Sequence, residues 1–268
     1  MPSVSSASVS DPHLETIHVD RREGVATITL DRPARKNAVN ALMWDELLIA
    51  FRALGGDADA RVVVITGAGG EFCSGADLTP GQPGPSNLAG MRHVGDVCLA
   101  LHRLPQPTIA RVDGVAAGAG INLALACDLV VASRRARFSE IFARRGLSID
   151  FGGSWLLPRL VGLQKAKELA LFADIIDAAE AERLGLVNRV VDVEDLDAVV
   201  GEWASRLAAG PPIALSLTKR MLNDSFDRTL EEAVEDEARS QVVNFGSADT
   251  AEAVTAFFEK REPHFRGQ

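Results

Sequence analysis

The sequence feature that most constrains this chain is the segment of residues 113–128, which reads DGVAAGAGINLALACD. Its first half is crowded with glycine and alanine, and its second half has apolar residues at helical spacing. Because the β-rich run 108–112 precedes it, the order strand, tight loop and helix is predicted. The first N–H groups of a helix have no internal acceptor and lie at the positive end of its dipole. The segment therefore predicts a place where bare backbone N–H groups bind an anion or a developing oxyanion.

A second segment upstream repeats the same order of elements. Residues 61–66 form a short apolar run of β-branched residues, which is typical of a strand buried on both faces. The glycine-rich loop 67–78 comes next, then residues 79–90, which we interpret as a mobile flap, and then a helix at 91–103. Strand, glycine loop and helix thus occur twice. This repeat predicts an α/β fold whose two loops meet on the ligand-binding side of a sheet.

The N-terminal residues predict a hairpin followed by a helix. Strands are expected at 15–20 and 24–30, and a helix at 40–54 with Asn40 as its N-cap. Residues 1–13 are rich in serine and lack a basic start before an apolar run, so we interpret them as a disordered tail and not as a secretory signal. Since no apolar stretch reaches membrane-spanning length, we expect a cytoplasmic protein that does not bind membranes.

The second half of the chain is predicted to be mainly helical, after a short strand at 129–131 and an irregular segment at 138–158. The expected helices cover residues 164–172, 178–184, 196–208, 211–224, 229–245 and 247–260. Prolines 211 and 212 cannot continue the helix before them, so the chain is divided there into a core, residues 14–210, and a helical module, residues 211–268. The apolar faces of this module need a partner, either the core or another subunit.

Composition argues against several classes of function. The chain has 28 basic and 37 acidic residues, a net charge of −9, which argues against a nucleic-acid partner, although the basic residues 134–137 could still grip a ligand's phosphates. Its three cysteines are widely separated and suggest neither a disulfide framework nor a metal site. The loops 67–72 and 118–123 lack the third glycine of a dinucleotide fingerprint, which disfavours a nucleotide cofactor.

Taken together, the two glycine-rich segments have a family resemblance. The pair formed by residues 72–78, FCSGADL, and residues 113–128 resembles the two signatures of the crotonase (enoyl-CoA hydratase/isomerase) superfamily. Four further segments are similar in order and spacing: residues 32–38, 152–159, 178–187 and 256–261. The resemblance extends from residue 14 to residue 265.

The resemblance implies a fold, an assembly and a site. The fold would be a spiral of ββα turns whose C-terminal helices build a homotrimer, often paired into a hexamer, and the substrate would be an acyl-CoA thioester. By motif position, the backbone N–H groups of Ala76 and Ala119 would polarise the thioester carbonyl and stabilise an enolate. Many members have glycine where Ala119 stands, so its methyl group would narrow the site.

The same resemblance assigns residues to the CoA moiety of the substrate, and it implies no other cofactor. CoA would lie near Arg35 or Lys36 and near Lys260 of a neighbouring subunit, with Leu78 and Phe257 also in contact with it. For each of the charged residues the alternative is an ordinary solvated surface charge.

The chain departs from the family pattern where protons are transferred. The hydratases of the family use two glutamates, and at those positions this sequence has Asn122 and Phe142. A neutral amide is no base, although Asn122 could orient a water molecule. Glu140 lies two residues from the second position, but the preserved spacing from Phe138 to the glycine pair at 152–153 argues against a shift of register.

Asp150 is the better candidate for a base. It resembles the acid before the glycine pair that acts as base in several enoyl-CoA isomerases and as nucleophile in the 4-chlorobenzoyl-CoA dehalogenase relative. Its apolar neighbours Ile149 and Phe151 are expected to raise its pKa. The alternative is that Asp150 caps the helix expected to start near residue 152.

These observations favour an acyl-CoA enzyme with an isomerase-type proton shift by Asp150. The alternatives are an enoyl-CoA hydratase of fatty-acid oxidation and a non-catalytic acyl-CoA-binding oligomer. A serine hydrolase using Ser74 is disfavoured, because the chain has no G-x-S-x-G motif and no histidine at a matched distance. His93 and His102 are expected to be surface residues.

Overall fold

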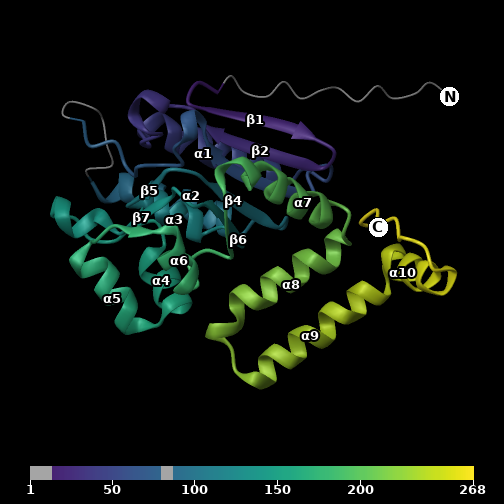
Figure 1. The fold of residues 1–268 in the computed structure, drawn as a ribbon. Helices are drawn as coiled ribbons and strands as arrows, with labels where there is room; N and C mark the ends of the chain where they lie inside the picture. The colour runs from purple at the N-terminus through teal and green to yellow at the C-terminus, as the bar shows by residue number, and fades with distance from the viewer. Residues whose placement is uncertain (1–13, 80–86) are drawn as a thin grey trace.

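The computed structural model describes residues 14–79 and 87–268, built around a six-stranded and a three-stranded β-sheet (Figure 1). The larger sheet consists, in spatial order, of β1 (Ile17–Arg22), β2 (Val25–Leu30), β3 (Val62–Gly67), β4 (Thr108–Val112), β6 (Leu129–Ser133) and β9 (Arg189–Val191). The smaller sheet consists of β5 (Val115–Ala117), β7 (Arg137–Ser139) and β8 (Ile176–Asp177). The pair β1 and β2 forms the predicted antiparallel hairpin, and the other pairs of the larger sheet are parallel.

Helices surround these sheets and continue beyond them toward the C-terminus. They are α1 (Ala41–Gly55), α2 (Leu88–His102), α3 (Ala119–Leu125), α4 (Gly153–Val161), α5 (Leu163–Phe172), α6 (Ala178–Arg183), α7 (Leu196–Ala208), α8 (Pro212–Asp224), α9 (Leu230–Phe245) and α10 (Ala248–Glu259). Within the described ranges, none of them is long and apolar enough to cross a membrane.

Strand β3 is buried on both faces, as its β-branched run predicts. Val63 and Ile65 pack into the main core together with apolar residues of α1, whereas Val62 and Val64 pack into a second core under α7. Helix α7 contacts β3, β4 and β6, so it covers one face of the larger sheet. Packing on both faces fixes the end of β3, from which the first glycine-rich loop leaves.

Local sequence signals predicted several element ends well. The side chain of Asn40 accepts a hydrogen bond from the N–H of Met43 at 2.9 Å, which confirms it as the N-cap of α1. The predicted irregular segment 138–158 is wrong, because it contains part of β7, the 3-10 helix η3 (Ile141–Arg145) and most of α4. Gly152 adopts a left-handed conformation as the N-cap of α4, and burial of Leu157 outweighs the helix-breaking signals around it.

The predicted flap at 79–90 is also partly corrected. Helix α2 begins at Leu88, three residues earlier than expected, because the side chain of Asn87 accepts a hydrogen bond from the N–H of Gly90 and caps the helix. The flap residues 80–86 and the predicted tail, residues 1–13, lie outside the described residues.

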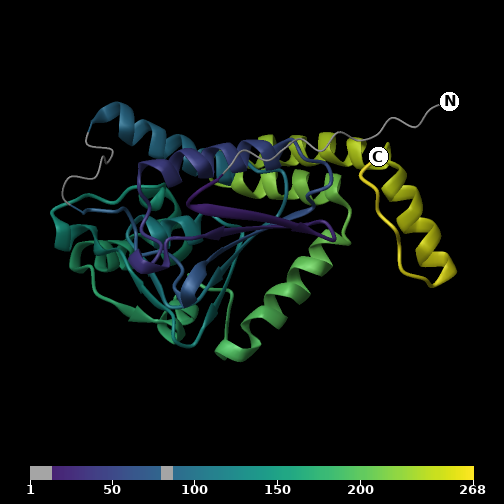
Figure 2. The ribbon, with the colours of Figure 1, turned by 90° about the horizontal axis from the view of Figure 1, so that it is seen from above.

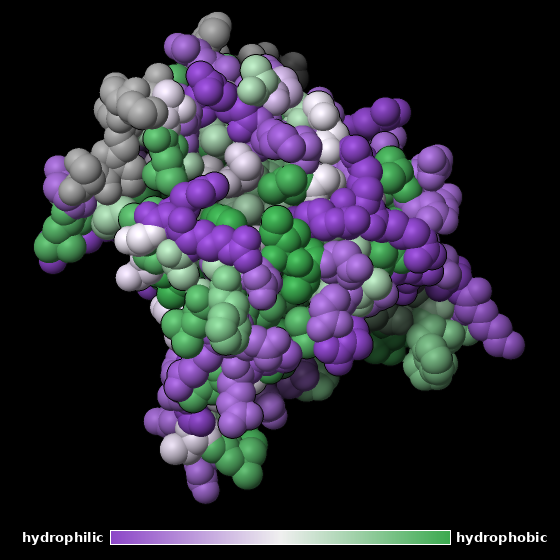
Figure 3. All heavy atoms as spheres, turned by 60° about the vertical axis from the view of Figure 1, so that its left-hand side comes forward, coloured by the Kyte–Doolittle hydropathy of each residue, from purple (hydrophilic) through white to green (hydrophobic). Residues whose placement is uncertain are grey.

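Of the C-terminal helices, α10 lies at one end of the molecule (Figure 2). The C-terminal helices expose large apolar side chains, among them those of Leu230, Val242, Phe245, Phe257 and Phe258. Apolar side chains are also exposed on α5, at the left of Figure 1, and Figure 3 brings this side of the molecule forward. The predicted C-terminal helices with exposed apolar faces are therefore present, while their division from the core as a separate module and their assembly into a trimer or hexamer stay predictions.

A nearly buried ion pair ties α8 to the core. The Nζ atom of Lys219 lies 2.7 Å from Oδ2 of Asp128 and donates to the carbonyl oxygen of Gln106 at 2.9 Å. The same Oδ2 accepts hydrogen bonds from the N–H and the hydroxyl of Thr108. The side chain of Lys219 is only 9% exposed, so water screens this pair poorly.

Replacing Lys219 with methionine is expected to lower the free energy of unfolding by about 2 kcal/mol, because Asp128 would lose its cation. The loss stays below that of a fully buried pair, since Asp128 keeps its bonds to Thr108 and is 24% exposed. The control is Lys165→Met, which breaks a surface pair with Glu168 and should change stability by less than about 0.5 kcal/mol. Urea denaturation at one fixed protein concentration compares the midpoints, and equal midpoints would contradict the prediction.

Candidate active site

The two glycine-rich segments meet, as their sequence predicts. Cys73, in the first loop, pairs with Ala116 of β5 as an isolated bridge, with backbone hydrogen bonds of 2.8 and 3.0 Å on either side. Gly120 allows this close approach, because a Cβ at this residue would lie 2.8 Å from the carbonyl carbon of Cys73 and closer still to its oxygen. The start of α3 is therefore held directly against the loop that carries Ala76.

The backbone N–H groups of Ala76 and Ala119 are unpaired among the described residues. Their neighbours are satisfied: the N–H of Asp77 donates to Val39, and the N–H of Gly118 donates to Ser139. Ala119 is the first residue of α3, where N–H groups have no acceptor within the helix. A Cβ on Gly75 would lie 3.5 Å from the nitrogen of Ala119, so the loop runs past this amide. The structure thus brings together two free donors at a helix N-terminus, the arrangement expected of an oxyanion site.

Asp77 holds the loop that carries Ala76. Its carboxylate accepts hydrogen bonds from the N–H and the hydroxyl of Thr79 at 3.0 and 2.6 Å, and from Arg32 at 2.8 Å. The hydrogen bond from the Thr79 hydroxyl, together with Arg32, lowers the pKa of Asp77 to about 2. Asp77 is thus ionised and fully engaged, so it is poorly suited to accept a substrate proton.

Asn122 lies on α3, one turn after Ala119, and is completely buried. Its Nδ2 donates to the backbone oxygen of Asp150 at 3.0 Å and to Oε2 of Glu140 at 3.4 Å. A Cβ on Gly153 would lie 2.6 Å from Oδ1 of Asn122, so the start of α4 packs tightly against this amide. One amide therefore links the carboxyl group of Glu140 to the backbone of Asp150, although spacing along the sequence argued against a role for Glu140.

Burial raises the pKa values of Asp150 and Glu140 above those of ordinary carboxyl groups. Burial raises the pKa of Asp150 to about 6, and burial together with the charge of Asp150 raises the pKa of Glu140 to about 8, despite its hydrogen bond from Asn122. At neutral pH, Asp150 is then mostly ionised and Glu140 mostly protonated. Such a pair, with pKa values pushed apart, is typical of acid and base roles.

The alternative reading of Asp150 as a helix cap is wrong. The N-cap of α4 is Gly152, and no side chain caps the helix. Within the described chain the Asp150 carboxyl accepts no hydrogen bond, and its Oδ1 is buried without a partner. Phe151 has a φ of +46° and stacks on Trp44 with ring centroids 5.3 Å apart, which fixes the loop. The carboxyl of Asp150 is therefore held in place but left free to react.

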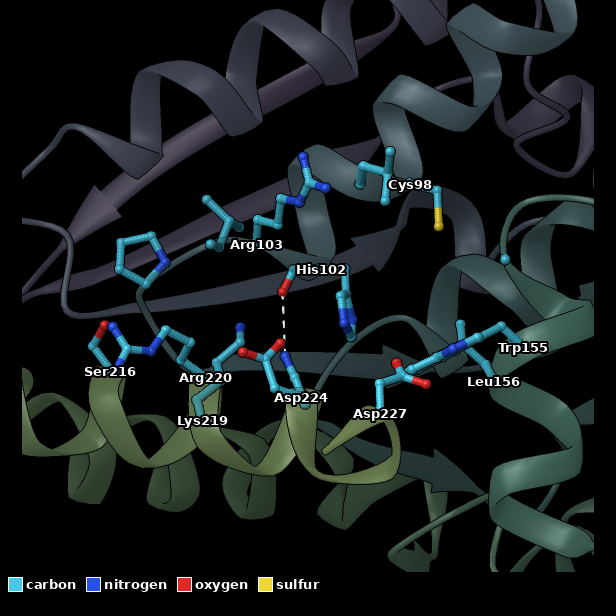
Figure 4. Close-up of a pocket in the computed structure, with 15 residues that line it drawn as sticks. Cys98, His102, Arg103, Trp155, Leu156, Ser216, Lys219, Arg220, Asp224 and Asp227 are labelled. Carbon is cyan, nitrogen blue, oxygen red and sulfur yellow. Dashed lines mark hydrogen bonds between the residues drawn. The ribbon is translucent and has the colours of Figure 1, made fainter. Parts of the chain in front are cut away.

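A cavity of about 720 Å³ lies next to this loop, between α2, α4 and α8 (Figure 4). Its lining includes Cys98, Leu99, His102, Trp155, Leu156, Lys219 and Asn223. Gly152 also lines it, so the cavity begins two residues from Asp150 along the chain. Burial, together with the charge of Asp150, raises the pKa of the Cys98 thiol to about 11. The cavity therefore provides open space close to the candidate base Asp150. Sequence patterns did not indicate this cavity.

His102 departs from its prediction as a surface residue. It is half-buried in the wall of the cavity, and its ring lies edge-on to Trp155 at a centroid distance of 5.5 Å. Burial and the nearby Lys219 lower the pKa of His102. The imidazole is therefore neutral at physiological pH. A half-buried histidine at the end of α2 carries no sequence signal, because its burial depends on α4 and α8.

The residues assigned to CoA fall into two separate groups. Arg35 and Lys36 are exposed beside the first loop, where their carbonyl oxygens accept hydrogen bonds from Ser74. The Lys36 ammonium lies 3.1 Å from Glu71, and Leu78 is 58% exposed. Phe257 and Lys260 lie at the end of α10, away from this loop, and both are exposed. A single chain therefore does not bring the two groups together.

The arginines of the basic segment 134–137 have partners within the protein, so they do not form an unoccupied phosphate-binding site. Arg135 contacts Asp113 through two nitrogens at 2.6 and 2.7 Å, and Arg134 pairs with Asp192 at 2.5 Å. Arg137 donates to backbone carbonyl oxygens. Because each of these guanidinium groups already has a carboxylate or carbonyl partner, the alternative that they bind a ligand's phosphates is disfavoured.

Comparisons with known proteins show which proteins this chain resembles. The sequence matches the family model described as enoyl-CoA hydratase/isomerase over residues 20–268. It is 43% identical to a probable enoyl-CoA hydratase of Rhodobacter capsulatus, covering 94% of this chain and 98% of that one. It is 38% identical to 1,2-epoxyphenylacetyl-CoA isomerase of Escherichia coli, covering 94% and 97%. The solved structure of enoyl-CoA hydratase from Bacillus anthracis has a TM-score of 0.91 at 32% identity, covering 95% of this chain and 100% of that chain. This likeness confirms the predicted α/β spiral fold.

Proposed function

The chain belongs to the enoyl-CoA hydratase/isomerase family of acyl-CoA enzymes, and from this premise we propose that it moves the double bond of an enoyl-CoA thioester by a proton shift through Asp150. The observation that carries the proposal is the state of the Asp150 carboxyl. Burial raises its pKa to about 6, and it has no hydrogen-bond partner among the described residues. Asn122, which stands at the first glutamate position of the hydratases, cannot act as a base.

In the proposed reaction, the N–H groups of Ala76 and Ala119 bind the thioester oxygen of the substrate. Ionised Asp150 takes a proton from the carbon between the double bond and the carbonyl, and the electron pair of the broken C–H bond delocalises onto that oxygen. Donors about 2.7–3.1 Å from this oxyanion stabilise the resulting dienolate. Asp150 then returns the same proton to the far carbon, which leaves the conjugated 2-enoyl thioester and the ionised carboxylate.

Incubation with a 3-enoyl-CoA and, separately, with a 2-enoyl-CoA tests this function. The shift forms a conjugated thioester, whose ultraviolet absorbance reports the rate, whereas hydration removes that absorbance. We expect the 3-enoyl-CoA to be converted and the 2-enoyl-CoA to be hydrated much more slowly. Rapid hydration of the 2-enoyl-CoA with no conversion of the 3-enoyl-CoA would contradict the proposal.

Hydration is the second candidate function, and one observation favours it. Glu140, protonated at neutral pH, lies beside Asn122 within the same hydrogen-bonded group as Asp150, so the site contains both an acid and a base. Addition of water requires both. Glu140 is only 2% exposed, however, and a proton donor must reach the substrate. We therefore rank the proton shift first. A non-catalytic acyl-CoA binder would bind thioesters of either kind without turnover.

The CoA moiety is proposed to bind at Arg35, Lys36 and Leu78 of one chain, with Phe257 and Lys260 supplied by a neighbouring copy. The exposed position of α10, away from the first loop, supports the second part of this proposal. A homotrimer or a pair of trimers would provide such a neighbour. Sedimentation measurements on the purified protein test the assembly, and a monomer would contradict it.

The pH dependence of the shift follows from the raised pKa of Asp150. Only the ionised carboxylate accepts a proton, so kcat should rise with pH through about 6 and approach its maximum near pH 7. An ordinary exposed aspartate, with a pKa near 3.8, would already be fully ionised at pH 5. Initial rates between pH 4.5 and 7.5 at saturating 3-enoyl-CoA measure the profile. A rate that does not change between pH 5 and pH 7 would rule out a base of this kind.

A further inference from the structure

Glu140 is a buried carboxyl that the proposed reaction does not use. It directly follows β7, and its side chain is 2% exposed. Within the described ranges, no lysine, arginine or histidine forms an ion pair with it, and its one hydrogen-bond partner is Asn122, at 3.4 Å. An ionised carboxylate in such a place would lose its hydration and gain only one long hydrogen bond in return. Its surroundings therefore favour the neutral acid.

Three buried oxygen atoms around Asn122 lack a partner. They are Oδ1 of Asn122, Oε1 of Glu140 and Oδ1 of Asp150. When Glu140 is ionised, all three oxygens can only accept hydrogen bonds, and Nδ2 of Asn122, the donor among these side chains, already donates to Glu140 and to the backbone of Asp150. A proton on Glu140 supplies a donor, and Oδ1 of Asn122 is the acceptor on the same amide that Glu140 already contacts. A hydrogen bond between these two groups would give two of the three oxygens a partner.

Asn122 transmits this state to the candidate base. Its Nδ2 donates to the backbone oxygen of Asp150 at 3.0 Å, and the close backbone of Gly153 prevents the amide from swinging away. If Glu140 ionises, the carboxylate attracts Nδ2 and competes with the backbone oxygen of Asp150 for this donor. A second negative charge then also stands near the carboxylate of Asp150 and opposes the formation of an enolate.

We propose that Glu140 is a positioning residue whose protonated carboxyl fixes Asn122, and through it the loop of Asp150, so that loss of this proton sets the alkaline limit of the reaction. The inference rests on the proposed function of Asp150 as the base. It differs from the hydratase alternative, because the Glu140 carboxyl here never exchanges a proton with the substrate.

Among the ionisable groups near Glu140, Glu140 itself is the one expected to change its protonation state near pH 8. Asp150, on the loop before α4, is the charged residue that acts on its pKa, which burial chiefly raises to about 8. From α2, Cys98 approaches Asp150, but the pKa of this thiol is about 11, so it stays neutral in the relevant range.

The other elements nearby carry charges at the surface, including Arg145 on η3 and Lys167 on α5, which are exposed. On η3, which follows Glu140, Arg144 pairs with Asp174. On α5, Lys165 pairs with Glu168, and on α6, Arg183 pairs with Glu180. These pairs lie at the surface, where solvent screens their effect on a buried carboxyl.

Two substitutions test the proposal through the pH profile of the 3-enoyl-CoA shift. The wild-type rate should rise through about pH 6 and fall again near pH 8, in a bell shape. Glu140→Leu removes the donor to Asn122 and should lower kcat at least about tenfold at pH 7. Glu140→Gln supplies an amide N–H that does not ionise, so it should recover most of this activity and keep its rate above pH 8. A falling limb at the same pH in Glu140→Gln, or full activity in Glu140→Leu, would overturn the proposal.

Infrared spectroscopy separates failure of this inference from failure of the proposed function. In an Asp150→Asn background, the carbonyl stretch of a protonated carboxylic acid should persist at pH 7, disappear above about pH 9 and be absent once Glu140→Gln is added. Absence of this band at pH 7 would overturn the inference even if the enzyme is an active isomerase. If the band is present and the wild-type enzyme converts no 3-enoyl-CoA, the proposed function fails while the protonated state of Glu140 stands.

Discussion

Replacing Asp150 with asparagine is expected to lower kcat for the 3-enoyl-CoA shift by about a thousandfold or more. The amide has the size of the carboxyl but cannot take up a proton, and general-base catalysis contributes about 10²–10⁴-fold to the rate. The free N–H groups of Ala76 and Ala119 stay in place, so the thioester should still bind. Stopped-flow absorbance measures the rate of the shift, and titration calorimetry with an acyl-CoA measures the binding.

The same substitution should not destabilise the protein, which distinguishes a reactive group from a structural one. Burial raises the pKa of Asp150 from 3.8 to about 6, so the folded protein holds this proton more tightly than the unfolded chain does. Stability is therefore lost as pH rises from about 4 to about 6. Asparagine carries no charge, so Asp150→Asn should melt at the same or a higher temperature at pH 7.

A matched control is Asp174→Asn, which removes an exposed carboxylate paired with Arg144. It should leave kcat within about twofold of the wild type, because such surface pairs contribute little. If Asp150→Asn retains more than a tenth of the wild-type kcat, Asp150 is not the base. Glu140, the other buried carboxyl group near Asn122, would then be the candidate base.

Features that depend on neighbouring residues in the chain were predictable from the sequence. Asn40 caps α1 because its side chain reaches an N–H three residues later, and Pro211 and Pro212 separate α7 from α8 because proline cannot continue a helix. The two glycine-rich loops were found in the same way. Their contact at Cys73 and Ala116 requires the parallel order of β3 and β4, which the repeated pattern of strand, loop and helix implies.

Features that depend on packing between distant segments were less predictable. Glu140 reaches Asn122 because β7 ends at Ser139 and the chain turns into η3, which spacing along the sequence does not reveal. The one available signal was an acidic residue within the otherwise largely apolar run 138–142, a placement that is unfavourable unless the carboxyl is neutral or paired. No sequence pattern indicated the cavity beside Trp155, because its walls are formed by three helices that are distant in sequence, α2, α4 and α8.

Adding a methyl group to Gly120 is expected to damage the proposed oxyanion site without touching any side chain of the reaction. A Cβ there would lie 2.9 Å from the Cβ of Cys73 and closer to its carbonyl oxygen, so either the first loop or the start of α3 must move. Such a movement separates the N–H of Ala76 from that of Ala119. Loss of one oxyanion donor costs about 10²–10³ in kcat, and Gly120→Ala should fall in this range.

The controls for Gly120→Ala use glycines that have free space. Gly95 on α2 and Gly201 on α7 have nothing within 4 Å of an added Cβ, so alanine there should keep full activity. Alanine in a helix interior should even stabilise each control variant by about 0.5–1 kcal/mol. Circular dichroism of Gly120→Ala must show the wild-type helix content for the comparison to be valid.

A second variant keeps the test decisive if Gly120→Ala does not fold. Gly75 approaches the same place from the loop side, has a φ of +97°, and a Cβ on it would lie 2.7 Å from the carbonyl oxygen of Ala117. Gly75→Ala should therefore reduce kcat in the same way. Because neither substitution changes Asp150, the pH at which the rate rises should stay near 6 in both variants while the plateau falls. Unchanged plateaus in folded variants would show that the two backbone donors do not hold the thioester oxygen in the rate-limiting step.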